Sequence, residues 1–430
     1  MPSKPSYRAR WVSYLLPIGL FLTMTAVVLL LARGYTFDLT GGLQKTGLIV
    51  LDSNPKNAYI TVNVRVDPKR TRATLKLPPG TYDLKIDLPG VHPWQQQIKL
   101  EPGRAELEEH ILLFRTQPGS DALTPATPAA QALSPSGNEL ALLNAEAGGV
   151  TLSSVRIRPN EVGTAKTIGS LPAEYATPRS FAWSDGDSRI VASAGGETRI
   201  LTLDGRTTVL PAGGRAVSAP GQPDAAVVEP EPGRLVRATA GAVEPYENEV
   251  AAWVASGDAL YVARTDGTLV RRGSGNDRRV VSQQPVLTDL SAAAENTERV
   301  YGRDAGKTLY RVTDKGLEQL ATDVERYTVS RDGNQVAYLK QRELRLWDRL
   351  KETDELLTRF TEAPEQIAVI PGGYYILYGR GGELHAMAAD GTNDTTLAAG
   401  IDLAGVINRE QLLVRDRSSG RMTALTILNR

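Results

Sequence analysis

The segment VSRDGNQVAYL, residues 329–339, decides the fold of most of this chain. It consists of a polar turn, Ser330-Arg331-Asp332-Gly333-Asn334, followed by a short apolar run, Val336-Ala337-Tyr338. An Asp–Gly pair favours a tight turn, because the Asp side chain can bond the nearby backbone and Gly tolerates a positive φ. The short apolar run after the turn is typical of a β-strand.

The same turn–strand unit recurs eight times, at a spacing of roughly 34–50 residues. That spacing is close to the ~40–45 residues of a four-stranded propeller blade. Residues 133–430 are therefore predicted to form a β-propeller of eight blades, with seven as the alternative. The copies are LSPSGNELALL (133–143), WSDGDSRIVAS (183–193), SAPGQPDAAVV (218–228), WVASGDALYVA (253–263), SAAAENTERVYG (291–302), VSRDGNQVAYL (329–339), VIPGGYYILYG (369–379) and VINREQLLVR (406–415).

These repeats resemble the WD40-like propeller repeats of TolB and related proteins. Ser134-Pro135-Ser136-Gly137-Asn138 and Ser330-Arg331-Asp332-Gly333-Asn334 resemble the first half of that repeat, and residues 382–393 resemble the second half. The resemblance implies the propeller fold. It implies no particular activity, because propellers host unrelated functions.

Upstream, residues 47–114 contain short β-type runs closed by Pro, Gly, Asn or Asp. Alternation is clear at Tyr82, Leu84, Ile86 and Leu88, which is the pattern of a half-buried strand. A compact antiparallel β-sandwich is expected here, so the chain outside its N-terminal helix is predicted to be all-β.

This segment resembles a PEGA domain, a small extracytoplasmic β-sandwich. Pro55-Lys56-Asn57-Ala58 stands at the eponymous motif, Leu77-Pro78-Pro79-Gly80-Thr81-Tyr82 matches L-x-P-G-x-Y, and Gly90-Val91-His92-Pro93-Trp94 matches G-Y-x-x-W with Val91 in place of Tyr. The resemblance implies a binding or scaffolding role near the cell envelope and no catalytic residues. Residues 115–132, rich in Pro, Ala and Thr, are interpreted as a linker.

The residues Trp11–Ala32 hold no charge over 22 positions, enough for a helix of about 33 Å across a ~30 Å hydrocarbon core. Lys4, Arg8 and Arg10 precede this segment and Arg33 follows it. By the positive-inside rule, residues 1–10 are expected in the cytoplasm, Trp11–Ala32 in the bilayer, and the juxtamembrane segment 33–46 and both domains outside the cell membrane. A cleaved signal peptide is the alternative, although the apolar run exceeds the usual h-region.

Composition excludes several classes of function. The chain has no Cys, so it has no disulfides, thiolate zinc sites or Cys nucleophiles. Four of the basic residues flank the apolar segment. The rest of the chain has 45 basic and 49 acidic residues, and this slightly negative net charge argues against a nucleic-acid partner. The three His residues (His92, His110, His385) show no metal or catalytic spacing, and nucleotide-binding and G-x-S-x-G motifs are missing. No catalytic residue, cofactor or metal is therefore predicted.

Weaker signals suggest contact sites. Asp185-Gly186-Asp187 and Asp390–Asp394 could offer oxygens to Ca²⁺, but turn chemistry explains them as well. Two basic loops could touch an anionic cell-wall polymer or lipid headgroups. Their residues are Arg271, Arg272, Arg278 and Arg279 in the propeller, and Lys69, Arg70 and Arg72 in the sandwich.

The predicted function is that of a non-enzymatic, single-pass membrane protein of the bacterial cell envelope. Its propeller would present a binding surface for a protein or a cell-wall glycan. Two alternatives stay open: a structural subunit of a larger envelope complex, and a propeller hydrolase or lyase with acidic residues at the channel mouth.

Overall fold

The computed structural model describes residues 7–32, 35–38, 42–124, 126–146, 148–158, 161–184, 187–273, 277–281, 285–313 and 315–428. Side chains are described over the same residues except 7–14, 31–32, 36–38, 42–44, 278–279 and 281. The chain divides into two compact units, Met1–Leu113 with Asn429–Arg430 and Phe114–Leu428. Each unit is considered by itself.

The first unit begins with helix α1 (Tyr7–Ala32), which contains the whole predicted apolar segment and Pro17. The large apolar side chains that are described in α1, from Leu15 to Leu29, are each more than half exposed to solvent. Among the described residues, no helix reaches the length and apolarity required to cross a membrane. Strands β1 (Tyr35–Asp38) and β2 (Gly42–Lys45) pair antiparallel within the predicted juxtamembrane segment.

The remainder of the first unit consists of two sheets. One has the order β5 (Arg65–Arg70), β4 (Tyr59–Val62), β7 (Gly80–Asp87), β8 (Trp94–Leu100), and the other β6 (Ala73–Leu77), β3 (Gly47–Asn54), β9 (Ala105–Leu112). The predicted antiparallel arrangement is wrong for one pair, because β3 and β9 are parallel. These are the first and last strands of the sandwich, so the chain returns to β3 through the opposite sheet and can run beside it in the same direction.

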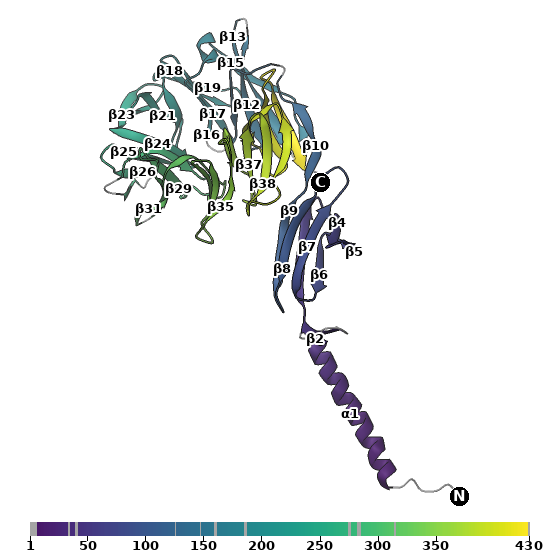
Figure 1. The fold of residues 1–430 in the computed structure, drawn as a ribbon. Helices are drawn as coiled ribbons and strands as arrows, with labels where there is room; N and C mark the ends of the chain where they lie inside the picture. Colours follow the sequence, from purple (N-terminus) through teal and green to yellow (C-terminus); the bar gives the residue numbers. More distant parts are fainter. Residues whose placement is uncertain are drawn as a thin grey trace. The chain divides into compact units, whose positions relative to one another are not determined.

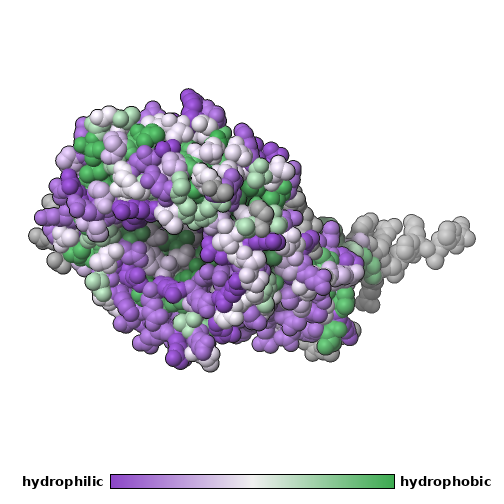
Figure 2. Space-filling model, turned by 90° about the horizontal axis from the view of Figure 1, so that it is seen from above, coloured by the Kyte–Doolittle hydropathy of each residue, from purple (hydrophilic) through white to green (hydrophobic). Residues whose placement is uncertain are grey.

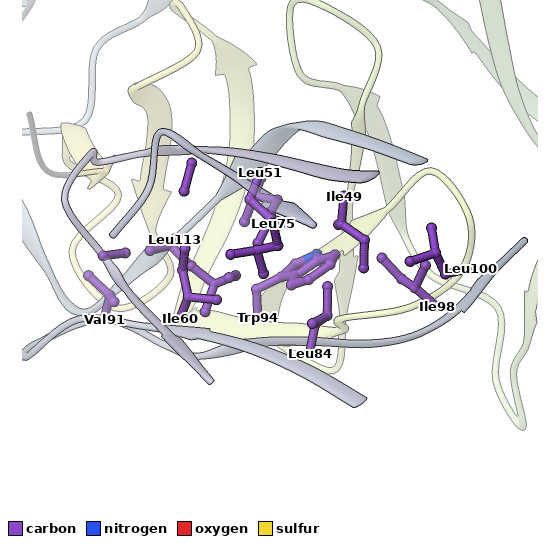
Figure 3. Close-up of a cluster of buried hydrophobic side chains, with 14 residues drawn as sticks. Ile49, Leu51, Ile60, Leu75, Leu84, Val91, Trp94, Ile98, Leu100 and Leu113 are labelled. Atoms are coloured by element: carbon purple, nitrogen blue, oxygen red, sulfur yellow. The ribbon is translucent and has the colours of Figure 1, made fainter. Parts of the chain in front are cut away.

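The core of the sandwich is formed by the alternate inward residues of both sheets (Figure 3). Trp94, 4% exposed, lies in the middle of this cluster near Ile49, Leu75 and Leu84. Each such fully buried side chain contributes roughly 1.5–3 kcal/mol of transfer free energy.

The predicted linker 115–132 is wrong at both ends, because residues 115–122 belong to one strand and residues 130–132 to another, β11 (Ala130–Leu133). Residues Phe114–Ala122 form strand β10, which pairs antiparallel with β42 (Met422–Leu428), the last strand of the chain. The composition suggested a linker because Leu123 is the only large apolar residue among residues 115–132. The pairing depends on backbone hydrogen bonds, which need no apolar side chains.

The second unit contains, among its described residues, eight mainly antiparallel sheets that surround a common centre (Figure 1). We number them in chain order. Sheet 1 has β11 (Ala130–Leu133), β12 (Glu139–Glu146), β13 (Gly149–Arg158), β14 (Glu161–Val162) and β15 (Lys166–Leu171), and is followed by the short 3₁₀ helix η1 (Ala173–Ala176). Sheet 2 has β16 (Ser180–Ser184), β17 (Arg189–Ala194), β18 (Glu197–Thr202) and β19 (Thr207–Leu210). Sheet 3 has β20 (Arg215–Ala219), β21 (Gln222–Glu231), β22 (Arg234–Ala238) and β23 (Val243–Asn248). Sheet 4 has β24 (Val250–Ser256), β25 (Ala259–Arg264), β26 (Leu269–Gly273) and β27 (Arg278–Val281).

The other four sheets repeat this arrangement. Sheet 5 has β28 (Leu287–Ala292), β29 (Val300–Asp304), β30 (Leu309–Thr313) and β31 (Gly316–Ala321). Sheet 6 has β32 (Val324–Val329), β33 (Gln335–Lys340), β34 (Glu343–Asp348) and β35 (Thr353–Arg359). Sheet 7 has β36 (Gln366–Val369), β37 (Tyr375–Arg380), β38 (Glu383–Ala388) and β39 (Thr395–Ala399). Sheet 8 has β40 (Ile401–Val406), β41 (Gln411–Asp416), β42 and the early strand β10.

Buried clusters between neighbouring sheets close the ring. One cluster joins Leu140 and Leu142 of sheet 1 to Leu413 and Met422 of sheet 8, so the last sheet packs against the first. Phe114 of β10 packs edge-on against Tyr375 of sheet 7, with ring centroids 5.2 Å apart. This continuous packing is the propeller-like arrangement that the repeats predict.

The polar turn that defines the repeat forms as predicted. In sheet 6, Ser330 Oγ donates to Asp332 Oδ1 at 2.6 Å, and the same carboxylate oxygen accepts the Asn334 N–H at 3.0 Å. Gly333 has a φ of 69°, which Gly adopts without strain. The turn therefore satisfies its own polar groups and aligns β32 with β33.

A similar turn makes stability depend on pH. Asp416 Oδ1, at the end of β41, accepts hydrogen bonds from the N–H and hydroxyl groups of Ser418 and Ser419 at 2.6–3.0 Å. The hydroxyl of Ser418 and the N–H of Ser419 are the main reasons that the pKa of Asp416 falls to about 2. This pKa lies below the usual ~4 for an unfolded chain, so the ionised turn stabilises the fold above about pH 4 and loses that effect as the pH falls toward 2.

We therefore expect Asp416→Asn to lower the melting temperature at pH 7, and the difference from the native chain to shrink steadily between pH 4 and pH 2. Thermal unfolding followed by circular dichroism at several pH values measures this. Glu146→Gln, on an exposed strand end, is the matched control for loss of a surface charge. A melting-temperature difference for Asp416→Asn that does not change with pH would contradict the assignment.

Candidate binding site at the centre of the propeller unit

The first strands of four consecutive sheets line a pocket of about 420 Å³, which we name the channel pocket. These strands are β28, β32, β36 and β40, so the pocket lies where sheets 5 to 8 meet around the centre of the ring. Its lining residues are Asp289, Arg303, Glu325, Arg326, Tyr327, Glu365, Gln366, Ile367, Ala368, Leu403, Ala404 and Gly405. Its volume is within the ~300–1,000 Å³ typical of small-ligand sites.

The two walls of the channel pocket differ in chemistry. Sheets 5 and 6 supply most of its charged groups, whereas sheets 7 and 8 supply Ile367, Ala368, Leu403 and Ala404. Two arginine side chains form hydrogen bonds to backbone carbonyl oxygens. Arg303 donates to the carbonyls of Val324 and Glu325. Arg326 donates to the carbonyl of Glu365. The charged wall is thus fixed across neighbouring sheets before any ligand arrives.

The carboxylates of the pocket keep more hydrogen-bonding capacity. Asp289 Oδ2 lies 3.4 Å from Arg303 Nη2, at the long end of hydrogen-bond distances, and Glu325 has no side-chain partner among the described residues. Glu365 is instead paired with Arg417, at 2.6 Å. Two carboxylates therefore face the pocket with acceptor oxygens available.

Tyr327 adds an uncommitted donor. Its hydroxyl is buried and meets the geometry of a hydrogen bond with no other described residue, and the side chain of Ser291 is near enough only to act against the rise of its pKa. Burial raises the pKa of Tyr327 well above its usual range, and the Asp289 carboxylate raises it further. The phenol is therefore neutral at physiological pH, and a buried hydroxyl without a partner favours a ligand group that can accept from it or donate to it.

The turns that follow the first strands meet one another at the ends of those strands. Arg331, in the turn of sheet 6, donates to the carbonyl oxygen of Pro135 at 2.6 Å and lies 3.5 Å from that of Ile407. Pro135 belongs to the turn of sheet 1 and Ile407 to that of sheet 8, so this one side chain links three sheets. On the face shown in Figure 2, hydrophilic residues predominate and surround a hollow.

The predicted basic loop of the propeller lies on hairpin β26–β27. Arg272 is neutralised there, with Nη2 2.8 Å from Glu247 Oε2 and Nη1 2.6 Å from Asp277 Oδ2. Arg271 lines a second cavity, described below, and its closest carboxylate oxygen is Asp258 Oδ1 at 3.8 Å. Arg278 and Arg279 pair through their backbone with β26, and their side chains lie outside the described residues. Of the two predicted arginines whose side chains are described, Arg272 is therefore neutralised and Arg271 faces the second cavity.

The predicted basic loop of the sandwich is largely engaged within its own unit. Lys69 Nζ donates to the Thr74 carbonyl at 2.7 Å. Arg70 lies over the Tyr59 ring at 3.7 Å, and Arg72 Nε lies 3.5 Å from Asp52 Oδ2. These contacts are mostly solvent-exposed and contribute little to stability.

The candidate Ca²⁺ segments are turns where the structure describes them. Asp390 Oδ1 accepts from the N–H and hydroxyl of Thr392, and Asp187 accepts from Ser136. Asp185 and Gly186 lie outside the described residues. In the described part of the chain, no group of three or more acidic or His side chains is placed to hold a metal ion. His385 is 8% exposed and stacks on Tyr378 at 4.7 Å, as expected of a packed side chain.

Reasoning from the sequence missed the channel-pocket residues Asp289, Arg303, Glu325 and Tyr327. Asp289 lies on the first strand of sheet 5, Glu325 and Tyr327 lie on the first strand of sheet 6, and Arg303 lies on the second strand of sheet 5. A charged or tyrosine residue early in a first strand, where apolar residues are expected, was the available signal. Without the strand registers it could not be recognised.

A search of curated proteins found no match to this chain. Similar solved structures include the C-terminal WD40 domain of Sif2, with 13% identity and a TM-score of 0.49, which covers 72% of this chain and 99% of that one. Sqt1 of Saccharomyces cerevisiae is 10% identical with a TM-score of 0.49, covering 73% of this chain and 98% of that one. The computationally designed Ika8 protein is 14% identical with a TM-score of 0.47, covering 71% and 98%.

One family model matches part of the chain. Residues 46–106 match the model of the PEGA domain, and this range contains strands β3 to β8 and the start of β9. The match confirms the PEGA resemblance for most of the predicted segment 47–114.

Proposed function

We propose that this protein is a membrane-anchored, extracytoplasmic binding protein of the cell envelope, whose propeller docks a partner at the channel pocket. In this proposal α1 spans the cell membrane with the N-terminus in the cytoplasm. The sandwich stands next to the membrane, and the eight sheets are the blades of one TolB-like, eight-bladed propeller. The partner is an envelope protein or a cell-wall glycan.

The observation that carries the docking site is the composition of the channel pocket. It combines an apolar wall, two carboxylates with available oxygens and a buried tyrosine hydroxyl without a partner. A few convergent polar groups beside apolar surface are typical of recognition sites. The arginines of the site are already fixed by backbone carbonyls, so little order has to be gained on binding.

Support for anchorage comes from the N-terminal segment. The span Trp11–Ala32 has no charged residue, lies within one continuous helix, and is preceded by Lys4, Arg8 and Arg10. Exposed apolar side chains all along the described part of α1 need a covering that water does not supply.

Two further functions stay as alternatives. A structural subunit of a larger envelope complex would use the same propeller against a permanent partner chain. A hydrolase or lyase would use Asp289, Glu325 and Glu365 as acid and base, and the convergence of these three carboxylates at the pocket is the observation in its favour.

The docking site is tested with full-length protein in mild detergent, using the variant Tyr327→Phe combined with Asp289→Asn. We expect a partner that co-purifies with the native chain to be reduced at least tenfold with this variant, because the hydroxyl and one carboxylate no longer contribute hydrogen bonds. Glu146→Gln is the matched control and should retain the partner. Full retention by the double variant would contradict docking at the channel pocket.

A further inference from the structure

A second cavity of the propeller unit is a groove of about 1030 Å³ formed by sheets 4, 5 and 6. Five basic side chains line it, and we name it the arginine groove after them. They are Arg271 on β26, Arg299 before β29, Arg311 on β30, Lys315 after β30, and Arg349 after β34. The groove is separate from the channel pocket and shares no lining residue with it.

Most of these charges lack a carboxylate partner. Arg349 is half-buried and Lys315 is exposed, and neither side chain has a hydrogen-bond or ion-pair partner among the described residues. Arg299 is held by neutral oxygens, the Asp332 carbonyl and Asn334 Oδ1 at 2.6 Å. Arg311 alone is closely paired, with Glu318.

The acidic residues of the groove do not balance this charge. Asp277 is bonded to Arg272, and Glu318 to Arg311. The carboxylate of Asp332 lies near Arg299, but it accepts hydrogen bonds from Ser330 and Asn334 in its own turn. Only Glu298 among the lining acids has no side-chain partner in the described part of the chain. The groove therefore keeps an excess of positive charge, and its half-buried members are partly desolvated without compensation.

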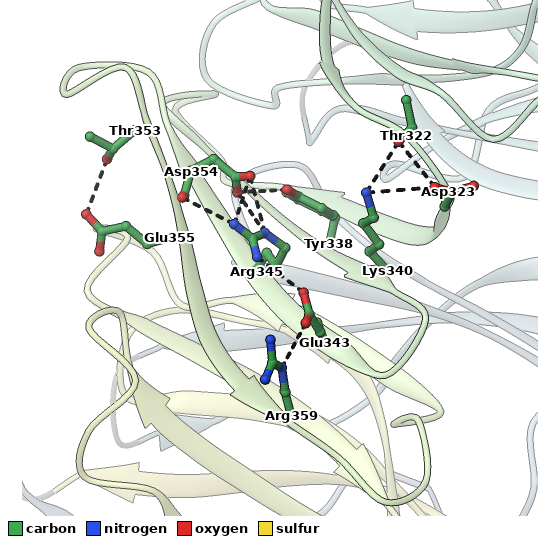
Figure 4. A network of polar contacts seen from close by, with 10 residues as sticks. All are labelled: Thr322, Asp323, Tyr338, Lys340, Glu343, Arg345, Thr353, Asp354, Glu355 and Arg359. Carbon is green, nitrogen blue, oxygen red and sulfur yellow. Dashed lines mark hydrogen bonds and ion pairs between the residues drawn. The ribbon is translucent and has the colours of Figure 1, made fainter.

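Elsewhere in the same unit, arginines of the outer strands are paired with carboxylates. In sheet 6, Arg345 lies between Asp354 and Glu343, and Arg359 also pairs with Glu343 (Figure 4). Such cross-strand pairs neutralise the arginines of the outer strands. In the arginine groove only Arg311 is closely paired with a carboxylate. Arg271 lies 3.8 Å from Asp258, Arg299 bonds neutral oxygens, and Lys315 and Arg349 have no partner among the described residues.

Two of the guanidinium groups, those of Arg299 and Arg311, are held in place. Arg311 lies over the Trp347 ring at 5.1 Å while its other side meets Glu318. Trp347 in turn packs against Tyr301, with centroids 6.1 Å apart. Burial raises the pKa of Tyr301 to about 12, and Arg311, Arg349 and Arg299 all act against that rise, so three positive charges converge near this ring. Arg299 and Arg311 therefore supply positive potential from fixed positions before a ligand binds.

The form of the groove limits the ligand. Tyr261 and Tyr301 are 3% and 1% exposed, and their hydroxyls donate to the carbonyls of Thr297 and Gly333. They present no open ring face on which a sugar or a base could stack. A guanidinium fork binds carboxylates in a bidentate manner, and the volume exceeds that of most small-ligand sites.

From this geometry we propose that the arginine groove binds an extended acidic peptide segment of a partner protein, whose Asp or Glu side chains pair with Arg349, Lys315 and Arg271. Arg299 and Arg311 are positioning residues that hold the walls and the positive potential of the groove. The bound carboxylates supply the counter-charges that the chain itself does not provide.

The test uses the full-length chain in detergent and fluorescence anisotropy of a labelled octapeptide of alternating Glu and Ala. The same peptide with Gln in place of Glu, a tetramer of galacturonic acid and inorganic phosphate serve as competing probes. We expect the Glu peptide to bind at least tenfold more tightly than the Gln peptide. The affinity for the Glu peptide should decrease as the salt concentration increases. The galacturonate and phosphate should compete poorly.

Variants assign the binding to the groove. The double variant Arg349→Gln, Lys315→Gln should bind the Glu peptide at least tenfold more weakly than the native chain. Arg342 is an exposed arginine on the β33–β34 turn, and Arg342→Gln should leave the affinity for the Glu peptide unchanged. Circular dichroism and the melting temperature verify that each variant folds. Equal binding of the Glu and Gln peptides, or equal affinity in the double variant and the native chain, would overturn the proposal. Tighter binding of galacturonate or phosphate than of the Glu peptide would overturn the assignment to a peptide.

Discussion

Phe114→Ala should destabilise the propeller unit by about 3–5 kcal/mol and leave the sandwich intact. Phe114 is 2% exposed and packs edge-on against Tyr375 of sheet 7, so its removal leaves a cavity where β10 joins the ring. The expected result is specific to one unit because Phe114 is the first residue of the second unit.

The adjacent residue provides the matched variant. Leu113 is fully buried, but it belongs to the core of the sandwich, and its N–H donates to the Asn54 carbonyl at 2.9 Å. Leu113→Ala should therefore cost about 2–5 kcal/mol in the sandwich alone. Two neighbouring substitutions are thus expected to weaken two different units.

Amide hydrogen exchange followed by mass spectrometry separates the two effects. Peptides from β37 and β42 should lose protection with Phe114→Ala, and peptides from β3 and β9 with Leu113→Ala. Loss of protection in the sandwich after Phe114→Ala would contradict the boundary at residue 114, and so would an unchanged β42.

Trp253→Ala is the second large expected effect, a loss of about 3–5 kcal/mol. Trp253 on β24 is 2% exposed, and its indole Nε1 donates to Glu229 Oε2 at 2.8 Å. The Arg215 guanidinium lies 4.2 Å from the ring centroid. The substitution creates a cavity between sheets 3 and 4 and removes the hydrogen bond to a partly buried carboxylate.

Two further variants apportion this loss. Trp253→Phe keeps an aromatic ring but removes the donor, and should cost about 1–3 kcal/mol. Trp183 is only half-buried, and its indole N–H donates to the Ala132 carbonyl at 2.7 Å. Trp183→Ala should therefore lower the free energy of unfolding less than Trp253→Ala does. Urea unfolding followed by far-ultraviolet circular dichroism measures the series. A loss for Trp253→Ala no larger than that for Trp183→Ala would show that Trp253 is not a central packing residue.

The sequence predicts the local elements of this protein well, because their signals are local. The turn at Ser330–Asn334 depends on side chains that bond their own backbone, and the alternation from Tyr82 to Leu88 specifies one buried face. Both could be found without knowledge of the rest of the fold.

Long-range pairing could not be predicted in the same way. Strand β10 pairs with β42 through the backbone, and its Pro-, Gly- and Thr-containing sequence resembles that of a linker. The parallel pairing of β3 with β9 likewise depends on topology and not on composition. Neither strand pairing can be recognised from residues that are adjacent in the sequence.

The candidate sites show the same limit. The predicted basic loop was defined by residues adjacent in sequence, but Arg272 is neutralised by Glu247 of another sheet. The charges that have no close carboxylate partner in the arginine groove include Arg299, Lys315 and Arg349, which come from separate turns and strands. Which charges stay uncompensated depends on which sheets become neighbours.

The most direct measurement of the central claim is isolation of the full-length protein from its native membranes in mild detergent, followed by identification of what co-purifies. A binding protein is expected to bring a stoichiometric partner from the membrane fraction, and a chain that lacks residues 114–428 should lose it. Residues 114–122 belong in that deletion because β10 is part of the propeller unit. Recovery of the chain alone, or a partner retained without the propeller unit, would contradict the account.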